Sequence, residues 1–107
     1  MPKTIILIPS RLAASRLPNK PLLKINNKSI INLVFQKAKS TGIGDAHVAT
    51  GDKEIFDEVT KAGGNCILTK KNHQTGTDRI YEAYEQLDLK NIDYIINLVF
   101  QKAKSTG

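Results

Sequence analysis

The chain of 107 residues has one cysteine, no tryptophan, three phenylalanines and three tyrosines. A single cysteine, Cys66, excludes an internal disulfide, and its apolar neighbours favour a small buried side chain over a reactive thiol. No apolar run approaches the roughly 20 residues of a membrane span, and the N-terminal run ends at Pro9, too soon for a signal-peptide core. We therefore expect one small cytoplasmic domain without a membrane segment.

Acidic residues are also absent from the first 44 positions, which carry eight lysines and arginines. The other 63 positions hold eight basic and ten acidic residues, so the formal charge of +6 is the sum of +8 and −2. Such a field attracts anions, but it does not choose between a nucleotide, a nucleic acid and a membrane surface. The few aromatic residues do not interleave with the basic segment, which makes a nucleic-acid-binding module the weaker alternative.

Short apolar runs alternate with segments of helical periodicity. The runs predict strands at 4–8, 46–50, 65–69 and 92–98, and the periodic segments predict helices at 29–40, 52–62 and 77–87. Ser29 and Thr75 are placed to cap two of these helices, and Gly63-Gly64 to end another. The alternating order predicts a three-layer α/β fold with a mostly parallel sheet of about four strands and three helices.

The segment IPSRLAASRLPNKPL at 8–22 follows the first predicted strand. It places Arg11, Arg16 and Lys20 in a loop with small residues and prolines, where guanidinium and ammonium groups could bind phosphate oxygens. Pro9 and Ser10 belong to the same turn. Ligands of parallel sheets bind beyond the carboxyl ends of the strands, so this loop should share one edge with the loops after 46–50 and 65–69.

Two motifs in this order, IPSRLAASRLPNKPL and HQTGTDR at 73–79, resemble those of the 3-deoxy-manno-octulosonate (Kdo) cytidylyltransferases, or CMP-Kdo synthetases. The resemblance runs from Thr4 to about Leu98 and implies a Rossmann-like nucleotidyltransferase half. Thr75 stands where the family usually has serine, which keeps the hydroxyl. By resemblance, the nucleotide and phosphate contacts are Pro9, Ser10, Arg11, Arg16, Lys20, His73, Thr75, Gly76, Thr77 and Arg79.

The resemblance also implies a reaction. The anomeric hydroxyl of Kdo attacks the α-phosphorus of CTP, the bond to the β-phosphate oxygen breaks, and CMP-Kdo and pyrophosphate form, with Mg²⁺ neutralising phosphate charge. The product is a precursor of lipopolysaccharide. A relative that activates another sugar is an alternative. Helix capping by Thr75 and Asp78 is compatible with a nucleotide role for Thr75, and Asp52 fits either a ribose or metal contact or a helix cap.

Residues 30–42 and 95–107 are the identical sequence IINLVFQKAKSTG. We therefore divide the chain into a partial nucleotide-binding domain, 1–98, and an aberrant tail, 99–107, that repeats 34–42. In the family, the strand that corresponds to 92–98 runs into a turn, and the aspartate of that turn resembles a metal ligand. Here that turn is replaced by Val99, Phe100, Gln101 and Lys102.

The replacement predicts no intact catalytic or metal site and no tightly bound Mg²⁺. We expect an inactive or CTP-binding-only fragment that lacks the Kdo pocket. Dimerisation, which is common in the family, is left open for this chain.

Overall fold

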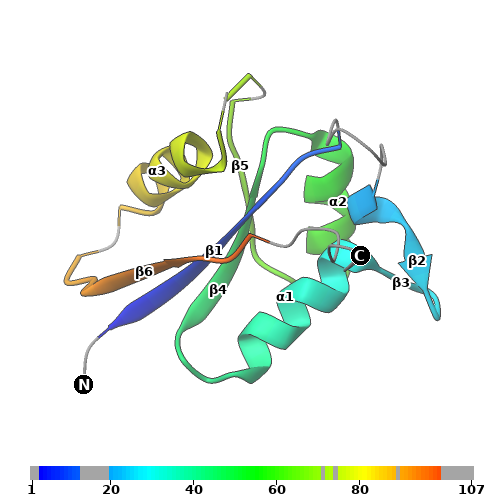
Figure 1. Cartoon of the computed structure of the whole chain (residues 1–107), viewed down its shortest axis with the longest axis horizontal. Helices are drawn as coiled ribbons and strands as arrows, with labels where there is room; N and C mark the ends of the chain where they lie inside the picture. The colour runs from blue at the N-terminus through cyan, green and yellow to red at the C-terminus, as the bar shows by residue number, and fades with distance from the viewer. Residues whose placement is uncertain (1–2, 13–19, 71, 74, 89, 100–107) are drawn as a thin grey trace, which may run out of the picture.

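The sheet is built around β1 (Thr4–Ser10), the most buried strand. The computed structural model describes residues 3–12, 20–70, 72–73, 75–88 and 90–99. In it β1 pairs in parallel with β4 (Asp45–Thr50) and with β6 (Tyr94–Asn97). The strand β5 (Cys66–Leu68) pairs in parallel with β4, and the sheet order is β5-β4-β1-β6 (Figure 1).

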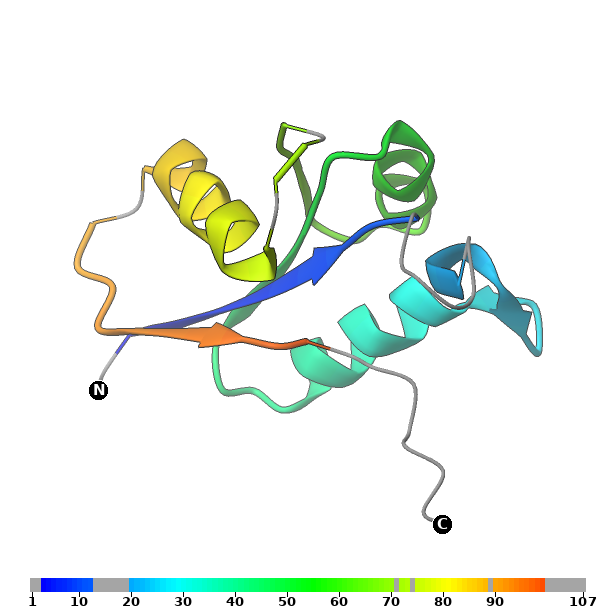
Figure 2. The same cartoon turned by 45° about the horizontal axis from the view of Figure 1, so that its top comes forward.

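Three helices cover the two faces of this sheet. On one face α1 (Ile30–Ser40) and α2 (Lys53–Lys61) pack with Ile6 and Ile8, while α3 (Gly76–Leu87) packs on the other face (Figure 2). Successive strand residues point to opposite faces, so β1 supplies both halves of the core: Ile5 and Leu7 face α3. The three-layer parallel fold expected from the sequence is confirmed.

The predicted helix boundaries agree with the structure to within about one residue. The Ser29 hydroxyl accepts a hydrogen bond from Asn32 N (3.3 Å), and the Thr75 hydroxyl accepts one from Asp78 N (3.0 Å), so both predicted caps are present. After α2, Gly63 takes a φ of +85°, a left-handed conformation that ends the helix and that glycine adopts without steric cost.

A short hairpin that the sequence analysis did not foresee links the basic segment to α1. A 3-10 turn, η1 (Lys20–Leu22), is followed by β2 (Lys24–Ile25) and β3 (Lys28–Ser29), which pair antiparallel. The two residues between them, Asn26 and Asn27, have φ values of 51° and 69°. Asparagine tolerates this region, which tight hairpin turns require at both central positions.

The repeated sequence folds in two ways. Ile30, Ile31 and Asn32 begin α1, whereas the same letters at Ile95, Ile96 and Asn97 lie in β6. This agrees with the predicted strand to about Leu98, whose backbone N–H donates to Leu7 O (2.9 Å). Most of the repeating tail, residues 100–107, lies outside the described ranges.

Candidate functional site

Three strands end at the same edge of the sheet, as the parallel topology requires. Ser10 is the last residue of β1, Thr50 the last of β4, and Leu68 the last of β5, and the registers pair Ser10 with Thr50 and Thr50 with Leu68. Helices α2 and α3 begin directly beyond this edge, so their N-terminal backbone N–H groups add partial positive charge there. We call this region the carboxyl edge.

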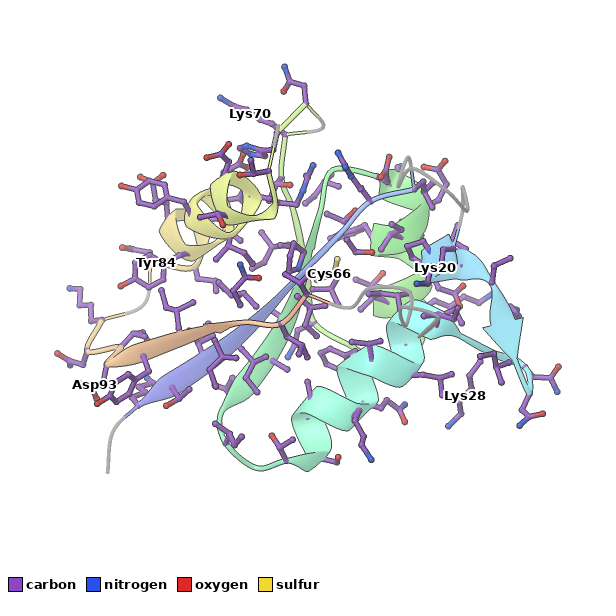
Figure 3. The ribbon with its side chains drawn as sticks, in the orientation of Figure 1. Lys20, Lys28, Cys66, Lys70, Tyr84 and Asp93 are labelled. Atoms are coloured by element: carbon purple, nitrogen blue, oxygen red, sulfur yellow. The ribbon has the colours of Figure 1, made fainter. Side chains whose placement is uncertain are left out.

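The first motif occupies the end of β1. Ser10 is 6 % exposed, and its hydroxyl oxygen has no hydrogen-bond partner among the described residues. Arg11 follows and is exposed, and Leu12 packs partly against the core under α1 and α2. Lys20 begins η1, beside those helices (Figure 3). The predicted phosphate contact Arg16 lies outside the described residues.

The second motif runs into α3. Thr75 caps the helix, Gly76 and Thr77 form its exposed first turn, and His73 precedes it, half-buried. The His73 Nε2 atom lies 2.7 Å from Glu82 Oε1, so the imidazole is engaged by a carboxylate of α3. The loop that begins at Lys70 is at the tip of the molecule beyond β5 (Figure 3).

The two motifs, separated by 50 residues in the sequence, meet at the carboxyl edge. A β-carbon placed on Gly76 would lie 3.4 Å from Pro9 Cγ and 3.6 Å from Pro9 Cβ, which is van der Waals contact. The cations of the two motifs also act on one another: burial is the main cause that lowers the pKa of Arg79, and the positive charge of Arg11 lowers it further. The fold therefore brings the predicted site residues Pro9, Arg11, Gly76 and Arg79 into one region.

Arg79 is buried, with 3 % of its surface exposed. Its Nη1 donates to the Thr69 hydroxyl and to Lys70 O (2.8 Å), so the side chain fixes the backbone that follows β5. Burial lowers the pKa of Arg79, and the carboxylates of Asp52 and Glu82 oppose that shift. The contacts of Arg79 thus fix this loop, while the phosphate contact that the resemblance implies for it stays a prediction.

Asp52 occupies the N-cap position of α2, but its side chain makes no capping hydrogen bond to that helix. The predicted helix-cap position is therefore confirmed, but without the side-chain hydrogen bond that usually accompanies it. Its Oδ2 instead accepts a hydrogen bond from Leu12 N (2.8 Å) across the edge, at the start of the basic loop. The N-cap spacing is visible in the sequence, but a partner 40 positions away is not.

Glu82 is a residue that sequence reasoning missed. Its carboxylate accepts hydrogen bonds from Lys70 N (3.1 Å to Oε1) and Gln86 Nε2 (2.6 Å to Oε2), in addition to its contact with His73. Burial raises the pKa of Glu82, but these hydrogen bonds outweigh burial, and the pKa lies below its ordinary value. Glu82 thus ties Lys70 and His73 to α3, and only its place on that helix could have suggested this.

The described residues do not form a protein-only magnesium site. Among them no group of three or more histidine, cysteine, aspartate or glutamate side chains is placed to hold a metal ion. Asp52, which follows β4 at the carboxyl edge, is 7 % exposed and directs an oxygen at Leu12 N. Val99 is described and is apolar, whereas Phe100, Gln101 and Lys102 lie outside the described residues. We therefore derive no step through a metal.

Two other titratable residues lie within strands. His47 in β4 is half-buried, and burial lowers its pKa while Asp45 opposes the shift. Cys66 in β5 is partly buried against the core of α1 and α2, and burial raises its pKa to about 12. The thiol therefore stays protonated near neutral pH, and its side chain is partly buried rather than fully buried as expected.

Together the parallel sheet, the crossover helices and the polar carboxyl edge define an α/β domain of the class in which nucleotides commonly bind beyond the strand ends. Residues 5–100 match the family model described as Cytidylyltransferase, and the chain belongs to this family.

The chain is also similar in sequence to curated proteins. It is 47 % identical over 97 residues to 3-deoxy-manno-octulosonate cytidylyltransferase 2 of Hydrogenovibrio crunogenus, and 44 % identical over 97 residues to 3-deoxy-manno-octulosonate cytidylyltransferase of Nitrobacter winogradskyi. Each match covers 90 % of this chain but only 39 % and 38 % of the relative, so the chain spans well under half their length.

A solved structure agrees with these relatives. The structure of CMP:2-keto-3-deoxy-manno-octonic acid synthetase complexed with CTP has a TM-score of 0.81 and 39 % sequence identity to this chain. The match covers 91 % of this chain and 39 % of that one. Separately, no helix in the described ranges is long and apolar enough to cross a membrane.

Proposed function

We propose that this chain binds CTP at the carboxyl edge of its sheet. The observation that carries the proposal is the contact between the two motifs, in which Gly76 at the start of α3 lies against Pro9 at the end of β1. One ligand that lies over this contact would reach both motifs. The solved relative with the same fold was determined as a CTP complex, which supports the choice of nucleotide.

The described side chains suit a triphosphate. Arg11 is exposed at the end of β1 and can make forked hydrogen bonds to phosphate oxygens. The buried Ser10 hydroxyl has no protein partner among the described residues, and a buried polar group without a partner carries a free-energy penalty. We infer that a ligand oxygen takes up this hydroxyl, and that Lys20 and Arg16 complete the phosphate contacts.

The reaction of this family, by resemblance, transfers the cytidylyl group from CTP to Kdo and releases pyrophosphate. We propose that this chain supports binding without transfer. Val99 and the residues through Lys102 stand where the family places its aspartate-bearing turn, and the described residues provide no substitute cluster of metal ligands. Orientation and charge neutralisation supply most of the rate in phosphoryl transfer, so loss of that turn should abolish turnover while CTP affinity is retained.

Calorimetric titration of the full chain with CTP, at low and at physiological salt, tests the proposal. Arg11→Ala should weaken CTP binding by about tenfold, since it removes a charge-assisted hydrogen bond. Lys39→Ala is the matched control, because Lys39 is an exposed cation in the last turn of α1, at the opposite end of the sheet. It should change affinity by less than about twofold, apart from weak long-range screening.

Ser10→Ala separates ligand binding from folding. It removes a buried hydroxyl that has no protein partner among the described residues, so the free energy of unfolding should stay the same or rise, while CTP affinity falls. Equal losses of affinity in the Arg11 and Lys39 variants, or tighter binding of a single-stranded oligonucleotide than of CTP, would contradict the proposed site. A measurable release of pyrophosphate in the presence of Kdo would contradict the absence of transfer.

A further inference from the structure

A buried carboxylate lies beside the anion-attracting loop. Asp52 is 7 % exposed, and its Oδ2 accepts a hydrogen bond from Leu12 N at 2.8 Å. Its own backbone N–H donates to the Thr50 hydroxyl (3.1 Å), and its carbonyl accepts from Ile55 N and Phe56 N (both 3.1 Å). The residue is therefore held rigidly between β4 and α2.

A carboxylate in this place repels a polyphosphate unless its charge is balanced. Burial makes an unpaired carboxylate unfavourable, so such groups are paired and hydrogen-bonded. Here the Leu12 N–H provides one partner, and the positive charge of Arg79 acts on the carboxylate from the α3 side. The negative charge is thus compensated inside the protein, which argues against direct contact between Asp52 and the ligand.

The hydrogen bond between Leu12 N and Asp52 lies where it can hold the backbone next to Arg11. Leu12 directly follows Arg11, so a hydrogen bond to its backbone fixes the first peptide of the loop beyond β1. The Leu12 side chain packs partly against the core on the same side, which provides a second anchor. A backbone position such as Leu12 that is fixed before the ligand arrives loses less conformational entropy on binding.

We propose that Asp52 is the positioning residue of the phosphate-binding loop, and that its carboxylate sets the direction of Arg11 by holding the Leu12 amide. The inference rests on the proposed function, because it assigns a role within the same CTP site. Asp52 belongs to neither motif and follows the end of a third strand, β4. The proposal assigns it a hydrogen-bonding role rather than contact with the nucleotide.

Two substitutions and one control test the proposal in the full chain. Asp52→Ala removes the acceptor, whereas Asp52→Asn keeps a carbonyl oxygen that can accept from Leu12 N. Asp57→Ala is the matched control, since Asp57 is an exposed aspartate on the same helix. CTP affinity is measured by titration, and the exchange rate of the Leu12 amide by NMR in the protein without nucleotide, with Val48 in β4 as the core reference.

We expect Asp52→Ala to weaken CTP binding by about tenfold and to speed Leu12 exchange by a similar factor, while Val48 exchange changes much less. Asp52→Asn should restore most of both properties, and Asp57→Ala should alter neither. Wild-type affinity in Asp52→Ala would overturn the proposal, as would failure of Asp52→Asn to restore Leu12 protection. If Asp52→Ala does not fold, Asp52→Asn decides, because protection of Leu12 in that variant is required by the proposal.

The proposed function can fail independently. If the wild-type chain binds no CTP, the assignment of the carboxyl edge as a CTP site is wrong, and with it the functional purpose of Asp52. The structural half of the inference is then decided by exchange alone: faster exchange of Leu12 in Asp52→Ala supports a positioning hydrogen bond, and unchanged exchange refutes it.

Discussion

Replacement of Arg79 by methionine should lower the free energy of unfolding by about 3 kcal/mol. Methionine keeps an unbranched apolar stem in the buried site but removes the guanidinium, which donates to the Thr69 hydroxyl and to Lys70 O. Hydrogen bonds from charged groups contribute about 1.5–3 kcal/mol each, and breaking a buried charge cluster by removal of one partner costs about 3–5 kcal/mol. We take a value at the low end, since Leu12 N still donates to the Asp52 carboxylate.

Urea unfolding, followed by circular dichroism, measures this change. A slope of about 2 kcal/mol per molar urea converts 3 kcal/mol into a midpoint lower by roughly 1.5 M. Because domains of this size are stable by about 5–15 kcal/mol, the variant should still fold. Arg11→Met is the control, since Arg11 belongs to the same basic region but is exposed, and it should change stability by less than about 0.5 kcal/mol. A loss below about 1 kcal/mol for Arg79→Met at unchanged slope would refute the reasoning.

Three further predictions concern the pH dependence, the thiol and a close backbone approach. The folded pKa of Glu82 lies below its ordinary 4.5, so its stabilisation is full above that value and is lost as the pH falls through the lower folded pKa. Glu82→Gln should therefore flatten the acid limb of a stability–pH curve below about pH 5, and an unchanged limb would contradict the hydrogen bonds to His73, Lys70 N and Gln86. Cys66, with a pKa of about 12, should react slowly with a thiol-specific disulfide reagent at pH 8 in the folded protein and quickly in urea, and equal rates would show that the thiol is accessible and unshifted. Gly44→Ala should lower the free energy of unfolding, measured by thermal unfolding, by more than about 2 kcal/mol, because a β-carbon at Gly44 would lie 2.0 Å from Thr4 O. Gly42→Ala is the control: a β-carbon there meets no atom within 4 Å, and its φ of +69° alone should cost about 1 kcal/mol.

The layers of the fold were predictable because the hydrophobic periods are regular. Four consecutive apolar residues, Ile5 to Ile8, indicate a strand covered on both faces, and the structure buries all four. Helix boundaries followed from residues with a local mechanism, such as the hydroxyl of Ser29 and the left-handed Gly63. These signals lie within a few residues of the feature that they determine.

The site was predictable only in part, because many of its contacts join residues far apart in the sequence. Strand order places the loops at one edge, so proximity of the motifs followed from topology. The contacts that shape the edge join positions far apart in sequence, as with Asp52 to Leu12 and Glu82 to Lys70. A single sequence contains no pairwise information of that kind. The β2–β3 hairpin is different, since Asn26-Asn27 is a local turn signal that the sequence analysis overlooked.

The repeated sequence that opens α1 also supplies Ile95, Ile96 and Asn97 of β6, and this bears on how the chain folds. Ile31 is fully buried in α1, whereas its counterpart Ile96 is 37 % exposed in β6, so the same residue is covered to different extents in the two copies. The residues that precede the two copies differ, because Ser29 caps the first copy whereas Tyr94 precedes the second. The first copy is tethered to the sheet by a short crossover into β4, whose closure costs less entropy than recruitment of a copy some 65 positions later. The residue that precedes each copy and its place along the chain, rather than the repeated residues themselves, therefore distinguish the helix from the strand.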